Sequence, residues 1–213
     1  ELLEANPRSF DIQRYGFSKW RMAFTERQVA THLCIAATLR ETLPSIREHL
    51  SETERSLALY TCVALAFSRL VTQHNAFAFI DSSRETIVGP WGDGKFPMSW
   101  DFVEANIFSG SGASFISALD WATTAYENLA GSGTAAVVSR GDATRQSFED
   151  ESFDCVITDP PYYDSVSYSN LADAYYIWLK RSLGVVYPEH LAAPLTPKKT
   201  EAIMAAYRHE NDK

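Results

Sequence analysis

The feature that most constrains the fold is a short apolar run that ends on an acid and two prolines. Residues 155–157 have the length and the β-branched content of a buried strand. Asp159 follows, and then Pro160 and Pro161, which cannot donate hydrogen bonds to a neighbouring strand and which fix their own φ angles. The sequence therefore predicts a strand that ends in a stiff extended turn. In an open α/β sheet, ligands bind beyond the carboxyl ends of the strands, which makes Asp159 and Tyr162 candidate functional residues.

The residues of this turn suit one reaction, the methylation of an exocyclic amino group. The nitrogen lone pair must be freed from the ring, which requires acceptors for both N–H hydrogens. The Asp159 carboxylate and the backbone carbonyl of Pro160 supply them. A base inside a duplex is out of reach and must be flipped out, and Tyr162 offers a flat face for stacking. We therefore predict a catalytic site at Asp159, Pro160, Pro161 and Tyr162. The structural alternative is a strand and a proline turn in which Asp159 caps and Tyr162 packs.

This tetrapeptide after a hydrophobic strand resembles the catalytic motif of amino-methyltransferases that use S-adenosylmethionine. Its longer context resembles the large adenine-specific DNA methylases that carry a zinc ribbon. The resemblance rests on residues 24–28, 100–106, 157–164, 168, 171–173, 176–181 and 196–199. It implies S-adenosylmethionine as cofactor, DNA as partner, and methyl transfer to N6 of a flipped adenine. Zinc ligands in paired C-x-x-C spacing do not occur in the chain, so we expect any zinc ribbon to lie outside it.

The fold class implied is α/β: part of a Rossmann-like methyltransferase sheet, at residues 96–213, preceded by a mainly helical region at residues 1–95. Residues 134–139 predict a second strand, which leads to Asp142. In the resembled fold an acid at this strand end accepts a hydrogen bond from the amino group of the cofactor's adenine, so Asp142 is the candidate cofactor-binding residue. A turn or N-cap aspartate is the equally supported alternative.

The loop after the tetrapeptide is polar and aromatic. Tyr163, Asp164 and Tyr168 are candidates for lining the pocket of the target base, and the alternative is a lid that packs on itself. The paired basic residues Lys180 with Arg181 and Lys198 with Lys199 are the best candidates for phosphate contacts, although solvated helix ends explain them as well.

The glycines at residues 108–112 match the Phe-x-Gly-x-Gly loop that cradles the cofactor in these methyltransferases. In the resembled fold, an acid follows the third strand of the complete sheet, and Asp142 would occupy that position here. Roughly 45 residues are needed between the glycine loop and that acid. Only 30 positions separate Gly112 from Asp142. Residues 100–107 also contain polar residues that a buried parallel strand would not tolerate. We therefore predict that this loop is a helix entry, and that the true cofactor loop belongs to the remainder of the methyltransferase, an upstream partner segment.

The first half of the chain predicts two antiparallel helices. Thr25 and Gln28 form a capping box, and apolar residues recur at helical spacing up to residue 50, with Pro44 expected to kink or divide the helix. A second capping box at residues 51–54 opens a helix that ends near His74. We expect His74 to be a cap or a partner of the helix dipole rather than a catalyst.

Charge and composition set further expectations. The net charge of −8 is unfavourable for binding the phosphates of DNA. We therefore expect this chain to contribute the reaction centre rather than most of the contacts with the DNA backbone. The three cysteines lie in apolar patterns and are expected to be buried free thiols. The absence of a membrane-length apolar run and of a signal peptide predicts a cytoplasmic protein with no membrane contact. The chain begins at Glu1, and we interpret it as a piece of a longer protein.

Two alternatives to adenine methylation stay open. Cytosine N4, an RNA base or a glutamine side chain would offer an amino group with the same requirement for acceptors. A non-catalytic role, in folding or in binding a partner, would fit the acidity of the chain.

Overall fold

Helix α1 (Glu26–Leu50) begins where the sequence predicts it. The Thr25 N–H donates to Gln28 Oε1 (2.9 Å) and the Gln28 N–H donates to Thr25 Oγ1 (3.2 Å), which confirms the capping box. Pro44 lies inside α1 without dividing it. The computed structural model describes residues 10–50, 53–91, 96–131, 133–134, 136–163, 166–198, 201 and 203.

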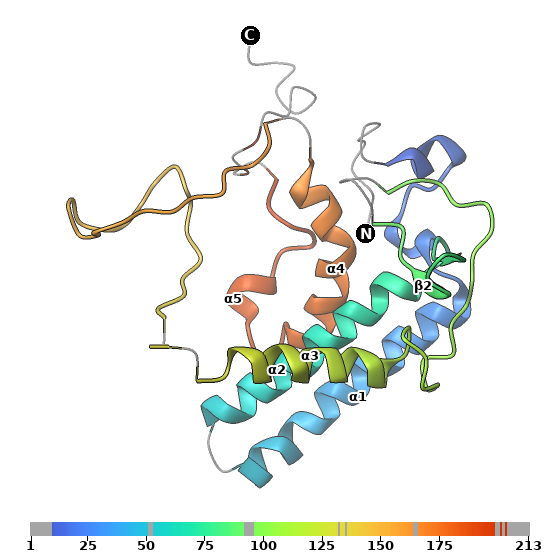
Figure 1. The fold of residues 1–213 in the computed structure, drawn as a ribbon, viewed down its shortest axis with the longest axis horizontal. Coiled ribbons are helices and arrows are strands. Elements are labelled where there is room, and N and C mark those ends of the chain that lie inside the picture. Colours follow the sequence, from blue (N-terminus) through green and yellow to red (C-terminus); the bar gives the residue numbers. More distant parts are fainter. Residues whose placement is uncertain are drawn as a thin grey trace.

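Helix α2 (Thr53–Gln73) returns antiparallel to α1 and packs against it, as predicted (Figure 1). The second capping box lies partly outside the described residues, because Ser51 and Glu52 are not among them. Asn75 closes the helix: its Nδ2 donates to the carbonyls of Val71 (3.1 Å) and Thr72 (3.0 Å). By length and mean hydropathy (1.2) α2 could cross a membrane, but it packs against α1, α3 and α4, so the predicted location of the protein stays a prediction.

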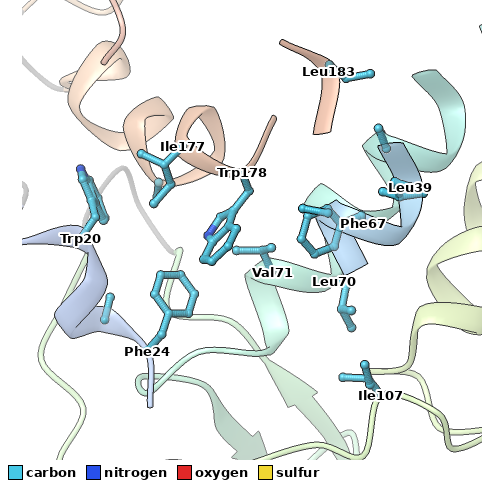
Figure 2. Packing of buried hydrophobic residues seen from close by; sticks show 14 of the residues in the cluster. Trp20, Phe24, Leu39, Phe67, Leu70, Val71, Ile107, Ile177, Trp178 and Leu183 are labelled. Atoms are coloured by element: carbon cyan, nitrogen blue, oxygen red, sulfur yellow. The ribbon is translucent and has the colours of Figure 1, made fainter. Parts of the chain in front are cut away.

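Helix α4 (Tyr168–Leu183) comes late in the chain and packs against both α1 and α2. Trp178 on α4 lies edge-on to Phe24 (5.4 Å between ring centroids) and to Phe67 (6.2 Å), and Figure 2 shows these rings together with Ile177 and Val71. The core therefore combines side chains from both sides of residue 96, and the proposed division of the chain there stays a prediction. Burying each large apolar side chain contributes about 1.5–3 kcal/mol.

Six smaller elements of the described chain surround this core. Two short 3₁₀ turns, η1 (Asp11–Tyr15) and η2 (Trp20–Ala23), bring Ile12 and Trp20 into it. Strands β1 (Phe79–Asp81) and β2 (Thr86–Val88) pair antiparallel with Ile80 opposite Ile87. Helix α3 (Phe115–Leu129) packs on α2, and the four-residue helix α5 (Pro188–Leu191) packs against α4.

The predicted Rossmann-like α/β fold is wrong. The described chain is mainly helical, and its one sheet is the two-stranded hairpin β1–β2. Residues 136–139 and 155–157 form no strand, and the chain between α3 and α4 projects away from the helices (Figure 1). A strand has no internal hydrogen bonds, so a β-branched run becomes one only where another strand lies alongside. The described chain places no strand beside either run.

Candidate active site

Asp159, Pro160, Pro161 and Tyr162 lie on the projecting segment and are exposed to solvent. They line one cavity of about 540 Å³, and Tyr168 contributes to the same wall. Because the two prolines restrict the backbone here, the carboxylate of Asp159 and the carbonyl of Pro160 are presented by a stiff segment even though no strand precedes it. The residues predicted to be catalytic are therefore brought to one cavity, although by a different local structure from the one expected.

The acceptor oxygens of this cavity are open. Within the described chain, no donor reaches the Asp159 carboxylate or the Pro160 carbonyl. The Pro161 carbonyl, by contrast, accepts a hydrogen bond from the Tyr163 N–H (2.8 Å). Tyr163 has a φ of +51°, in the left-handed region that non-glycine residues rarely adopt. The chain therefore turns sharply just after Tyr162, and it returns to the same cavity at Val166 and Tyr168.

Of the two predicted base-pocket residues that the structure describes, Tyr168 lines the cavity. It is the first residue of α4, and its hydroxyl oxygen lies 3.4 Å from the backbone nitrogen of Tyr162, at the long end of hydrogen-bond distances. Tyr163 is 70% exposed and does not line the cavity. Asp164 lies outside the described residues. Two tyrosine rings, at 162 and 168, therefore border the open acceptors.

Asp142 lies at the start of a turn. Its Oδ1 accepts hydrogen bonds from the Thr144 N–H (2.8 Å) and the Thr144 hydroxyl (2.7 Å), and these bonds hold the pKa of Asp142 below its usual value. The turn role considered from the sequence is thus present. Asp142 also lines a second cavity, of about 770 Å³, together with Arg140, Glu189 and Glu201.

The second cavity lies between the projecting segment and the C-terminal part of the chain. Glu189 comes from α5 and Glu201 from the segment beyond it. Burial raises the pKa of Tyr176 on α4, and the positive charge of Arg140 opposes this shift, which places Arg140 near that helix. The wall of this cavity combines three carboxylates with the guanidinium of Arg140 and the imidazole of His190, a set suited to a ligand that carries both positive groups and a carboxylate.

A set of polar contacts, here called the α4 clasp, joins the start of α4 to residues 196–201. Ser169 donates its N–H to Glu201 Oε1 (2.8 Å) and its hydroxyl to Glu201 Oε2. Asp173, which is 1% exposed, pairs with Lys198 Nζ (2.7 Å) and accepts from the Thr196 N–H (3.0 Å) and hydroxyl (2.6 Å). Tyr168 lines the first cavity and Glu201 the second, so the clasp lies where the two cavities approach each other.

Sequence analysis missed this clasp, although one signal for it exists. Asp173 stands one helical turn before Ile177, on the face that packs into the core. A carboxylate on a buried helical face requires a cation or several donors. Lys198 is that cation, so its ammonium group is engaged inside the protein, while its role as a phosphate contact stays a prediction. Lys180 likewise donates to the carbonyls of Ala192 (3.1 Å) and Ala193 (2.7 Å), and Lys199 lies outside the described residues.

A second polar group lies in the core, away from both cavities. His74 directly follows α2, where its N–H donates to the Leu70 carbonyl (3.0 Å), and its buried Nδ1 lies 2.9 Å from His32 Nε2. Burial, reinforced by His74, lowers the pKa of His32 to about 3. Burial also lowers the pKa of His74, while Glu104 opposes that shift. Glu104 in turn binds Arg27 (Nη2 to Oε2, 2.5 Å), so residues 24–28 and 100–106, both part of the stated resemblance, meet here.

The glycine-rich loop at residues 108–112 leads into α3 and is not preceded by a strand in the structure. Ser114 caps the helix, because its hydroxyl accepts from the Ser117 N–H (3.1 Å). Phe108 is 79% exposed. This is the helix entry that the spacing predicted, while its relation to a cofactor stays a prediction.

Two expectations about metals and thiols can be compared with the structure. No group of His, Cys, Asp or Glu in the described part of the chain is arranged to hold a metal ion. The prediction of buried cysteines is wrong: all three free thiols, Cys34, Cys62 and Cys155, are exposed. Cys34 and Cys62 lie on the outer faces of α1 and α2, which the apolar pattern around them did not reveal.

No protein-family model matches this chain, and no curated protein and no solved structure does either. The resemblance to the zinc-ribbon adenine methylases therefore stays a prediction from the motifs.

Proposed function

We propose that the chain carries the reaction centre of an S-adenosylmethionine-dependent DNA methyltransferase that acts on N6 of a flipped adenine. The observation that carries this proposal is the cavity at Asp159–Tyr162, in which two acceptor oxygens have no donor in the described chain and two tyrosine rings lie at the border. An amino group entering this cavity would donate one hydrogen to the Asp159 carboxylate and the other to the Pro160 carbonyl.

These two hydrogen bonds supply what the reaction needs. With both N–H hydrogens engaged, the nitrogen lone pair leaves conjugation with the ring and points out of its plane. S-adenosylmethionine, if bound beside this cavity, would supply the methyl group to that lone pair and be left as the thioether, and the nitrogen would lose one proton. Asp159 is the adjacent acceptor for that proton. Tyr162 and Tyr168 hold the base by stacking, which contributes about 1–3 kcal/mol per base.

The second cavity is the proposed place of the cofactor. Its carboxylates at Asp142, Glu189 and Glu201 suit the ammonium group, the sulfonium and the ribose hydroxyls, and Arg140 suits the carboxylate. We further propose that the glycine loop that cradles the cofactor belongs to the remainder of the enzyme, which would act as the partner of this chain.

The decisive test replaces Asp159 by Ala in the full-length protein. Methyl transfer from tritium-labelled cofactor to DNA should fall by about 10²–10³, the range for removing one acceptor or donor that acts in the transition state. Asp154→Ala is the matched control, since Asp154 is an exposed acid of the same segment that lines neither cavity. Near-normal transfer by the Asp159 variant would refute the assignment.

Two further measurements separate the alternatives. Mass spectrometry of nucleosides and of digested protein distinguishes N6-methyladenine from N4-methylcytosine and from methylglutamine. Calorimetry with S-adenosylmethionine tests the place of the glycine loop, because we expect weak or no binding by the 213-residue chain alone. Micromolar binding would mean that this chain holds the cofactor without an upstream loop, and loss of that binding on replacing Gly110 or Gly112 would assign it to the loop at residues 108–112.

A further inference from the structure

Two apolar runs, here called the exposed runs, stand in solvent on the projecting segment. The first comprises residues 136–138, in which Val137 is 99% and Val138 is 91% exposed. The second comprises residues 155–157, in which Val156 is 74% and Ile157 is 92% exposed. In neither run is the backbone paired with another strand of the described chain.

Such exposure is unusual for these residue types. Single surface apolar residues are ordinary, but valine and isoleucine rank among the most frequently buried side chains, and consecutive exposed ones in extended backbone mark a site of association. Unpaired extended backbone adds a row of N–H and C=O groups that can bind another chain. The exposed runs therefore combine apolar side chains and free backbone groups.

Charge identifies the kind of occupant. Residues 136–163 contain two arginines and six acidic residues, a net charge of −4, which is half of the total of −8 in a small part of the chain. These acids oppose a broad contact with phosphates, and phosphates gain nothing from the valines, so the DNA contact proposed above is confined to the cavity at Asp159. A second copy of the chain would bring the same acids against each other in a two-fold contact. The complementary surface is an apolar one bordered by lysine and arginine.

We propose that the exposed runs are a docking surface for a different polypeptide, one that presents an apolar strip edged by basic side chains. Its position links docking to the cavities, because residues 136–138 lead into Arg140 and Asp142, and residues 155–157 lead into Asp159. The surface is defined by exposure and charge alone, so it does not depend on the reaction proposed above.

The test places a photo-crosslinking amino acid at Val137 or Ile157 of the protein in its own cells, with Val185 as control. Val185 is 65% exposed but lies after α4, away from the projecting segment. We expect adducts with one protein from positions 137 and 157 and none from 185. Adducts with DNA and no protein, adducts with a second copy only, or no adduct at either position would overturn the proposal.

The captured protein is then purified and titrated by calorimetry. Val137→Asp and Ile157→Asp should each weaken binding at least tenfold, Val185→Asp should leave it unchanged, and affinity should fall as salt rises. Because residues 137 and 157 are almost fully exposed, neither variant should alter the melting temperature, so loss of binding cannot be attributed to loss of the fold. Equal binding by all three variants would overturn the proposal.

Discussion

Replacing Lys198 by Met should destabilise the protein more than its place near the C-terminal end suggests. Asp173 is 1% exposed and Lys198 is 14% exposed at the side chain, so the pair is largely removed from water. Removing one partner of such a pair costs about 3–5 kcal/mol, because the remaining charge stays buried. The two donors of Thr196 still reach Asp173, which favours the lower end, about 3 kcal/mol. For a chain of this length, the midpoint of thermal unfolding should fall by roughly 6–12 °C.

Urea unfolding followed by tryptophan fluorescence measures this, since Trp178 is buried on the same helix as Asp173. Lys180→Met is the matched control, because Lys180 is a half-buried lysine of α4 that donates to backbone carbonyls and pairs with no carboxylate of the described chain, and it should cost less than about 1 kcal/mol. The double variant with Asp173→Asn removes both charges and should recover most of the loss. A cost for Lys198→Met below 1 kcal/mol, or a double variant as unstable as the sum of the two single ones, would refute the reasoning.

Three further predictions concern the core and the surface. Trp178→Ala should cost about 3–5 kcal/mol in urea unfolding, through lost contacts and the cavity left between α1, α2 and α4; a cost under 1 kcal/mol would contradict the packing. The free energy of unfolding should decline as pH falls from 6.5 towards 3. His32 binds a proton in the unfolded chain over this range but stays neutral in the folded protein, because folding lowers its pKa to about 3. The slope reaches about 1.4 kcal/mol per pH unit. His32→Gln should flatten that slope in pH-dependent unfolding and the exposed His49→Gln should not, whereas equal slopes would exclude His32 as the source. All thiols should react with Ellman's reagent in the folded protein, and a thiol that reacts only in denaturant would contradict the exposure of Cys34, Cys62 or Cys155.

The parts of the fold that sequence predicted are those governed by neighbours along the chain. Thr25 and Gln28 are three residues apart, and a capping box depends on little else. Helical periodicity works for the same reason, since residues three and four apart share a face. Both helices of the first half were therefore predictable, as was the entry of α3 at Ser114.

The parts that sequence missed depend on distant partners. Val156 and Ile157 have the composition of a buried strand, but composition cannot supply the neighbouring strand on which burial depends. Asp173 and Lys198 are separated by the whole of α5 and its flanking loops, so their pairing has no local signature beyond an acid on an apolar helical face. At the candidate site, the motif at Asp159–Tyr162 and Tyr168 were found from residue chemistry, whereas Glu201 depends on how the chain folds back.

The location of α4 has a consequence for the robustness of the molecule. This helix follows the projecting segment in the chain, yet its tryptophan is enclosed by rings from α1, α2 and the loop before α1. A peptide-bond cut anywhere between residues 140 and 160 would leave two pieces that remain associated through that enclosure. The helical core and the projecting segment that bears the acid–proline motif are thus structurally separate, so mutations can change the projecting segment without destabilising the core.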